Sequence, residues 1–187
     1  MALVHDESED ETPSERPVPS SGLMSDEAVI EIREASRADH EWVARHLRGW
    51  WGSRTIVGHG GEWDAARLPA LLAVRAEQMV GLATFEVQSV DCRLVTLNAI
   101  DEGVGVGSAL LAAVIERAGA SGCRRVWLTT TNDNLHAMRF YQRRGLRIVA
   151  VYSGAVDKAR QMKPSIPEVG NDGIHIHDEL ELEIKIG

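Results

Sequence analysis

Residues 101–108, Asp-Glu-Gly-Val-Gly-Val-Gly-Ser, carry glycine at every second position and lead into an apolar pattern with helical spacing. Glycine leaves backbone N–H groups unshielded by side chains, and N–H groups just before a helix attract anions. The stretch therefore indicates a loop that binds a phosphate group. The alternative is that the glycines only allow a tight connection between a strand and a helix.

Two common nucleotide-binding loops do not match this stretch. A P-loop needs lysine followed by serine or threonine after its last glycine, whereas Gly107 is followed by Ser108-Ala109. A dinucleotide-binding Gly-x-Gly-x-x-Gly motif that starts at Gly103 needs a third glycine at position 108, which is serine. The phosphate compound must therefore be identified from other residues.

A second motif lies one predicted strand and one predicted helix further along the chain. Residues 134–146 have the form Asn-x-x-Ala-x-x-Phe-Tyr-x-x-x-Gly-Leu. Together the two motifs resemble the GNAT superfamily of N-acetyltransferases, whose phosphate loop has the form [Gln/Arg]-x-x-Gly-x-[Gly/Ala] and whose following helix carries the Asn and the Phe-Tyr pair. The resemblance covers roughly residues 29–187.

The resemblance implies both a fold and an activity. The fold is a single mixed α/β (α+β) domain, with a largely antiparallel, splayed sheet flanked by helices. The activity is acetyl-CoA-dependent transfer of an acetyl group directly to a primary amine, on a small molecule or a peptide that the sequence does not identify. Two alternatives stay open: a non-catalytic acyl-CoA-binding or regulatory module, and a phosphate-binding scaffold without preference for CoA.

The resemblance also implies which residues bind acetyl-CoA. The loop would bind the pyrophosphate through Glu102, Gly103, Val104, Gly105, Val106, Gly107 and Ser108. The strand before it would pair with the pantetheine arm through the backbone of Leu97, Asn98, Ala99 and Ile100, and Asn134 would contact the same arm. The chain departs from the motif at Glu102, where relatives have Gln or Arg, and an acid there repels a pyrophosphate.

Two residues are candidates for proton transfer. A tyrosine hydroxyl, with an ordinary pKa near 10, can protonate a leaving thiolate, and the resemblance puts Tyr141 beside the sulfur as this general acid. The alternative for Tyr141 is a buried aromatic that packs beside Phe140. Glu86, at the end of a predicted strand, lies where several relatives have a carboxylate that deprotonates the amine; the alternative is an exposed glutamate.

Other polar and aromatic residues are weaker candidates. His175 and His177 alternate on one predicted face, but no third ligand stands at a recognisable spacing, so we expect no metal site. The irregular stretch 154–173 and the Trp50-Trp51 loop flank the predicted site and are candidate walls for the acceptor. Plain core packing is the alternative for the two tryptophans.

The pattern of apolar residues predicts the elements that would position these groups. We expect strands at 29–33, 71–75, 80–87, 91–100, 126–130, 146–152 and 179–186, the last one half-buried with an acidic outer face. We expect helices over 39–48, ended by Gly49, over 106–118, and from a cap at Asn134 to a stop near Gly145.

Composition limits the class of protein. The net charge of −8 comes mostly from residues 1–27, where eight acidic residues stand against one arginine, so we expect a disordered acidic tail before a domain at 28–187. The nearly neutral body gives no basic face for nucleic acid. Cys92 and Cys123 lie in apolar segments and predict reduced core thiols, which with the lack of a membrane-spanning stretch predicts a cytoplasmic protein. Relatives often form homodimers, so that assembly stays open.

Overall fold

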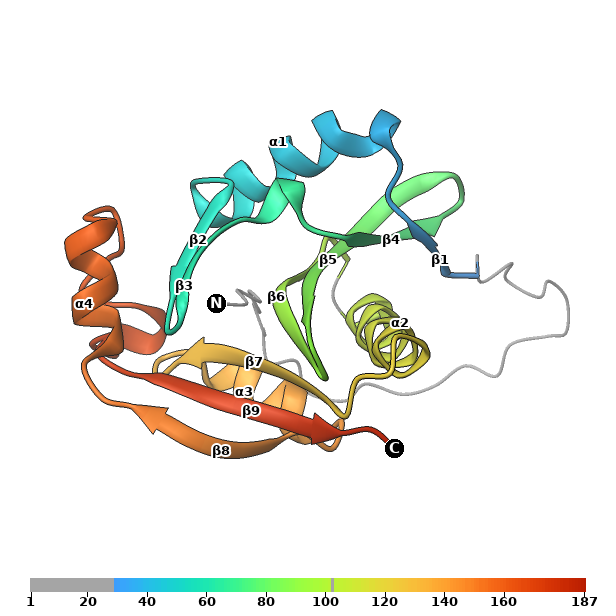
Figure 1. The fold of residues 1–187 in the computed structure, drawn as a ribbon. Helices are drawn as coiled ribbons and strands as arrows, with labels where there is room; N and C mark the ends of the chain where they lie inside the picture. The colour runs from blue at the N-terminus through green and yellow to red at the C-terminus, as the bar shows by residue number, and fades with distance from the viewer. Residues whose placement is uncertain (1–28, 102) are drawn as a thin grey trace, which may run out of the picture.

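The structure is a computed structural model that describes residues 29–101 and 103–187, so the predicted tail 1–27 and Glu102 lie outside the described residues. A seven-stranded sheet in the order β1-β4-β5-β6-β7-β9-β8 forms its centre, and a separate two-stranded hairpin, β2-β3, lies over it (Figure 1). The strands of the large sheet are β1 Glu31–Glu34, β4 Ala70–Arg75, β5 Gln78–Gln88, β6 Asp91–Ala99, β7 Arg125–Thr131, β8 Arg147–Tyr152 and β9 Glu179–Lys185. The hairpin strands are β2 Thr55–Gly58 and β3 Gly61–Asp64, and the helices are α1 His40–Trp51, α2 Val106–Ala120, α3 Leu135–Gln142 and α4 Ala155–Met162.

The sheet opens between its two central strands. β6 and β7 run parallel and pair only where residues 91–93 meet residues 125–127. Beyond this point they diverge, and Figure 1 shows the hairpin β2-β3 and α4 at the open side. All other pairs of neighbouring strands are antiparallel. The predicted fold class, a largely antiparallel splayed sheet with flanking helices, is therefore confirmed.

The two faces of the sheet carry separate apolar cores. On one face, α2 and α3 pack on a cluster that includes Leu110, Val114, Val126, Leu128 and Tyr141. On the other face, α1 and the hairpin pack on a second cluster that includes Val43, Leu47, Ile56, Leu82 and Val95. Gly81 of β5 lets α2 approach closely, because a Cβ there would lie 2.6 Å from Val106 Cγ1. This contact fixes the position of the first turn of α2 against the sheet.

Two predictions near the N-terminal side of the domain were wrong. Gly49 does not end the first helix, because α1 continues through Trp50 and Trp51 and ends at Gly52, whose φ of 67° is left-handed. A glycine costs a helix interior only about 1 kcal/mol, so tertiary packing overrides it. Trp50 and Trp51, predicted in a loop, are therefore the last residues of α1, and the chain that follows forms the hairpin β2-β3.

Two further predictions were wrong near the C-terminal side. The stretch 154–173 is not wholly irregular, because it begins with α4, a short polar helix whose Val156 and Ala159 are buried. β9 exists where the alternation predicted it, but its acidic face is not an outer face. Glu179 and Glu181 are 5% and 7% exposed, since the hairpin and neighbouring side chains cover them.

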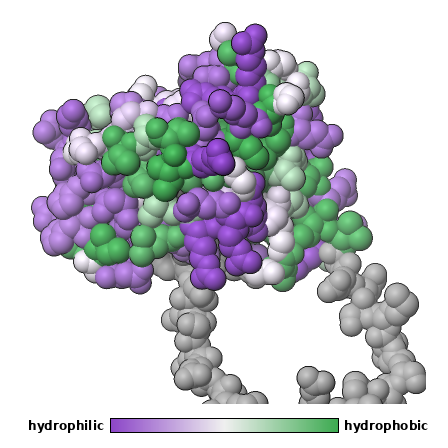
Figure 2. Space-filling view, turned by 90° about the horizontal axis from the view of Figure 1, so that it is seen from below, coloured by the Kyte–Doolittle hydropathy of each residue, from purple (hydrophilic) through white to green (hydrophobic). Residues whose placement is uncertain are grey.

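The remaining predicted elements agree with the structure to within a few residues. Both cysteines are buried and free, as predicted, and burial raises the pKa of the Cys92 thiol to about 12. β8 is one of the two outer strands of the large sheet, and seen from below this side of the molecule is mainly hydrophilic with separate apolar patches (Figure 2). No helix within the described ranges is both long and apolar enough to cross a membrane.

Candidate active site

The glycine stretch connects β6 to α2 as predicted and leaves open space around its backbone. Gly103 and Gly105 have φ values of 77° and 91°, which side chains other than glycine rarely adopt. A Cβ placed on either glycine would meet nothing within 4 Å. Gly105 precedes the first residue of α2, so the free N–H groups of the helix face this open space. The geometry suits an anion at the start of α2.

A cation that the sequence did not single out lies at the same helix end. Arg144, just after α3, donates from Nε to Ser108 Oγ at 3.0 Å and from Nη1 to the carbonyl of Phe140 at 2.9 Å. Its guanidinium also stacks on the Phe140 ring at 3.6 Å. Within the described part of the chain it forms no ion pair with a carboxylate, and burial followed by repulsion from Arg143 lowers its pKa. A cation beside the positive end of a helix is unfavourable unless an anion joins it.

The end of β6 keeps one edge free. Residues 97–99 pair with β5 on one side, while β7 has already diverged on the other. Asn98 is fixed from the opposite face, where its Oδ1 accepts a hydrogen bond from Trp51 Nε1 at 2.9 Å. Across the gap, Thr130 Oγ1 of β7 is buried without a hydrogen-bond partner among the described residues. The free backbone of β6 and this hydroxyl are groups that an inserted polar chain would satisfy.

Asn134 and Tyr141 both lie on α3, on the face of the sheet that also carries α2. Asn134 caps the helix, with its Oδ1 accepting from the N–H of Ala137 at 3.0 Å. Tyr141 is 2% exposed and belongs to the apolar cluster that also includes Leu97 of β6 and Leu128 of β7, the two strands that diverge. Burial raises the pKa of its phenol, so the hydroxyl is protonated at neutral pH.

Glu86 lies on the opposite face and is half-buried. Its Oε2 accepts hydrogen bonds from Trp63 Nε1 at 3.0 Å and from Gln88 Nε2 at 2.9 Å. Glu86 of β5 lies opposite Arg93 of β6 in the strand register, and Arg93 is the last residue of β6 that pairs with β7. Glu86 and Tyr141 therefore lie on opposite faces of the sheet.

A narrow cavity of about 30 Å³ lies where β6 and β7 part, on the face that carries the hairpin. Residues from both diverging strands, the hairpin, α4 and β9 line it, among them Val95, Thr129, Trp63, Val156, Ile166 and Glu179. Neither Glu86 nor Tyr141 is part of its wall. A wider groove of about 490 Å³ beside it shares Gly58 and Ala159 with the cavity and opens between the hairpin tip, α4 and the end of β8.

Arg93 forms part of the cavity wall and is 7% exposed. Its guanidinium lies between the rings of Trp63 and Trp127, 3.8 Å and 4.5 Å from their centroids, and Nη1 donates to the carbonyl of His59 at 2.9 Å. Burial lowers its pKa, and the carboxylates of Glu179 and others oppose this shift. Arg93 thus ties the tip of the hairpin to the sheet.

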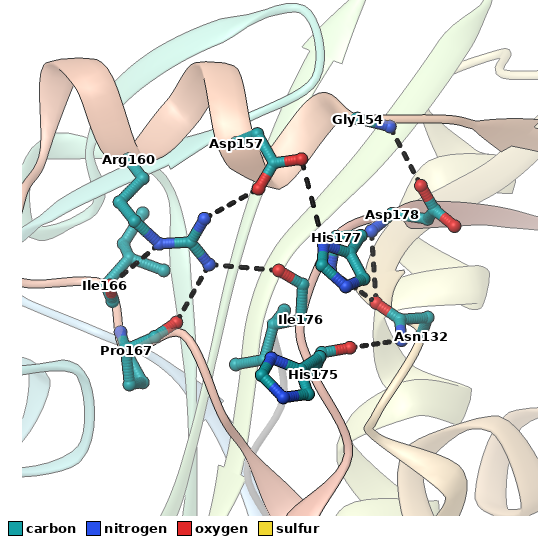
Figure 3. A network of polar contacts seen from close by, with 10 residues as sticks. All are labelled: Asn132, Gly154, Asp157, Arg160, Ile166, Pro167, His175, Ile176, His177 and Asp178. Carbon is teal, nitrogen blue, oxygen red and sulfur yellow. Dashed lines mark hydrogen bonds and ion pairs between the residues drawn. The ribbon is translucent and has the colours of Figure 1, made fainter.

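The segment from α4 to β9 forms another wall (Figure 3). Arg160 of α4 donates to the carbonyls of Ile166, Pro167 and Ile176, at 2.9–3.1 Å. Asn132 Oδ1 accepts from the N–H groups of His177 and Asp178 at 2.9 Å and 3.0 Å. These bonds hold Ile166 against the cavity and fix the chain directly before Glu179. Val156, Ala159 and Ile166 place part of the stretch 154–173 in the cavity wall, and its role as a wall for the acceptor stays a prediction.

The two histidines of this segment stack on each other. The rings of His175 and His177 lie parallel with centroids 5.8 Å apart. In residues 29–101 and 103–187, no three histidine, cysteine, aspartate or glutamate side chains are arranged to hold a metal ion.

Comparison with known proteins connects this geometry to a family. The profile of the acetyltransferase (GNAT) family matches residues 23–146. The uncharacterized protein YdhI of Bacillus subtilis is 38% identical over 141 residues, which are 75% of this chain and 86% of YdhI. The chain belongs to the GNAT acetyltransferase family. The resemblance seen in the two motifs is thereby confirmed.

Two solved structures share the GNAT fold and contain the cofactor. A Bacillus subtilis acetyltransferase in complex with CoA superposes with a TM-score of 0.63 at 15% identity and covers 85% of this chain and 100% of its own. A GNAT acetyltransferase from Elizabethkingia anophelis with acetyl-CoA bound superposes with a TM-score of 0.60 at 17% identity, and covers 87% and 100%. This GNAT chain has an open glycine loop, a free edge on β6 and Arg144 beside Ser108.

Sequence reasoning missed three residues of this GNAT site. Arg144 occupies a variable position of the second motif, so only its place beside Ser108 marks it. Arg93 and Glu179 were missed for a different reason, because burial of a charged side chain under a hairpin cannot be deduced when the hairpin itself is not predicted. The signal that could have found Glu179 was the alternation of β9, which predicted two faces but not which one is covered.

Proposed function

We propose that the protein is an acetyl-CoA-dependent N-acetyltransferase that transfers the acetyl group directly to a primary amine. One observation carries the proposal: β6 leaves β7 after only three residue pairs and then runs with a free edge, up to Ala99, toward a glycine loop with left-handed backbone and open surroundings. An extended, polar chain that ends in a pyrophosphate satisfies both features at once. Membership of the GNAT family supports the same chemistry.

Different residues of the chain bind different parts of the cofactor. The backbone of residues 103–108 binds the pyrophosphate, and residues 97–100 with Asn134 bind the pantetheine arm. Arg144 supplies the positive charge that the loop itself lacks, since Glu102 and Val104 replace basic or neutral polar residues of the motif. The bound cofactor supplies an activated acetyl thioester.

Protons must move for an ammonium ion to become an amide. The nitrogen loses one proton before it attacks the thioester and a second one after the attack, while the leaving thiolate takes up one proton, so one proton is released to solvent in each turnover. Tyr141 is the proposed donor of the proton to the thiolate, because a phenol is protonated at neutral pH; burial raises its pKa, which makes it a weaker acid than an exposed tyrosine. Its membership of the cluster that joins β6 and β7 supports a place beside the gap.

Glu86 is the proposed acceptor of the first proton, directly or through water. Two observations support this role. Glu86 is the cross-strand neighbour of Arg93, at the point where β6 and β7 diverge, and the hydrogen bond from Trp63 fixes the orientation of its carboxylate. Because Glu86 lies outside the cavity wall, we propose that a water molecule carries the proton from the amine to Glu86.

Titration calorimetry with acetyl-CoA, followed by a thiol-release assay on a panel of amines, tests the proposal. Micromolar binding and amine-dependent release of CoA are expected. Binding without release by any amine would favour a regulatory acyl-CoA-binding module. Displacement of acetyl-CoA by simple inorganic phosphate at similar concentrations would instead favour a phosphate scaffold.

A further inference from the structure

Glu179 is a buried carboxylate with incomplete hydrogen bonding. Its Oε2 accepts from the backbone N–H of His59 at 2.9 Å, and no other described residue donates to the carboxylate. The side chain is packed under Gly58, where a Cβ would lie 3.2 Å from Oε1. Arg93 acts on Glu179 through its charge but forms no ion pair with it within the described part of the chain. Oε1 keeps some exposed surface, because it is not among the fully buried polar atoms that lack a partner, so a donor in the cavity can reach it.

A ligand bound in the cavity would supply a donor to Glu179. Glu179 is the acidic residue of the cavity wall, whose other residues are mainly apolar, threonine or aromatic. Arg93 is the cation of the same wall, but its Nη1 is occupied by the His59 carbonyl and its faces by two indole rings. The volume of about 30 Å³ holds one or two small groups, such as the end of an alkylamine.

The charges around the cavity favour a cation as the guest. Glu86, Glu179 and Glu181 all act electrostatically on Arg93, so three carboxylates surround one guanidinium. Arg125 offsets part of this charge, because it pairs with Glu181, but it also pairs with Asp91 and Glu183. An added ammonium group therefore meets a site with an excess of negative charge.

We propose that Glu179 binds the ammonium group of the acceptor, and that the acceptor is a primary amine at the end of a slender, unbranched alkyl chain. The terminal –CH2–NH3+ group occupies the narrow cavity, and the rest of the acceptor lies in the wider groove at the hairpin tip. This inference rests on the proposed function and names its substrate class. Glu179 is a specificity-determining residue that touches the substrate.

A structural role for Glu179 is the competing explanation. The His59 N–H bond to Glu179 and the Arg93 bond to the His59 carbonyl together fasten the hairpin. Glu179→Gln separates the two roles, because glutamine keeps the shape and an oxygen that accepts from His59 but removes the charge. Glu183→Gln is the matched control, since Glu183 lies on the same face of β9 but pairs with Arg125 and does not line the cavity.

The test uses n-butylamine and its branched isomer tert-butylamine as acceptors at saturating acetyl-CoA, with release of the CoA thiol as the readout. Glu179→Gln is expected to raise the KM for n-butylamine by about tenfold or more, as for loss of a charged hydrogen bond. The KM for acetyl-CoA and the melting temperature stay unchanged, Glu183→Gln behaves as the parent, and tert-butylamine is a poor acceptor for all three. A KM for n-butylamine within twofold of the parent value, or equal use of both isomers, would overturn the proposal.

A second measurement separates this inference from the proposed function. Binding of n-butylammonium without acetyl-CoA is followed by tryptophan fluorescence, because Trp63 lines the cavity. Saturable binding to the parent and to Glu183→Gln, and its loss in Glu179→Gln, supports the ammonium site even if no thiol is released, in which case only the proposed transfer fails. Absence of binding to the parent protein, or equal binding to all three proteins, overturns the ammonium site.

Discussion

Replacing Arg144 by methionine is expected to weaken acetyl-CoA binding while the chain stays folded. Methionine keeps much of the contact with the Phe140 ring and removes the charge beside Ser108. A hydrogen bond to a charged group contributes about 1.5–3 kcal/mol, and the partial exposure of Arg144 favours the lower half of this range. The dissociation constant should therefore rise about ten- to thirtyfold.

Two further variants separate charge from geometry. Arg144→Lys keeps the charge but loses the planar fork that bonds Ser108 through two nitrogens, so we expect an intermediate loss of about threefold. Arg143→Met removes a charge from the exposed neighbouring position and is the matched control. Its effect should stay below about twofold and disappear in high salt, because exposed charges are screened.

Titration calorimetry with acetyl-CoA at low and high salt measures all three variants, and thermal melting checks the fold, because Arg144 also donates to the Phe140 carbonyl. An unchanged dissociation constant for Arg144→Met would refute the assignment. Equal losses for Arg144→Met and Arg143→Met would also refute it, because they would show a general effect of net charge.

Three other predictions concern catalysis and stability. Tyr141→Phe should slow acetyl transfer by up to about a hundredfold in single-turnover assays with acetyl-CoA affinity preserved, and an unchanged rate would return Tyr141 to a packing role. Gly81→Ala should lower the free energy of unfolding by about 1–3 kcal/mol in urea titrations, because the new Cβ would overlap Val106; parent-like stability would show that α2 can move away. Asp39→Asn should lower the melting temperature at pH 7, because hydrogen bonds from Arg33 and Ser36 hold the pKa of Asp39 well below its ordinary value of 3.8. This stabilisation is present above pH 4 and lost as the pH falls through the lower, folded-state pKa, so a gap between variant and parent that stays constant into strong acid would contradict it.

The central part of the fold could be predicted because local signals there agree with packing. The glycines at 103 and 105 need left-handed backbone, and Asn134 caps α3 through its own side chain, so both motifs fix their structure within a few residues. The alternating apolar residues of β6, β7 and β9 likewise face a core that the strands form together. The glycine loop and the capped helix of the candidate site therefore follow from the sequence, whereas Arg144 does not.

The acceptor half could not be predicted, because distant contacts decide it. β2 and β3 are each four residues long and contain glycine at the turn, and they are fixed to the sheet by Arg93 and Glu179 rather than by strong strand propensity. α4 is short and polar, and its Arg160 bonds the segment that follows it. Neither feature leaves a periodic pattern that a single sequence reveals.

The order of the strands has a consequence for how the protein is made. β9 lies between β7 and β8, although it follows both of them in the chain. β1, β4, β5 and β6 can pair with one another as soon as they leave the ribosome, because each precedes β7. β7 and β8 must wait with exposed backbone edges until β9 arrives, and such unpaired edges promote aggregation during synthesis. The same late strand carries Glu179, so the proposed acceptor half of the site is completed only after β9 has paired.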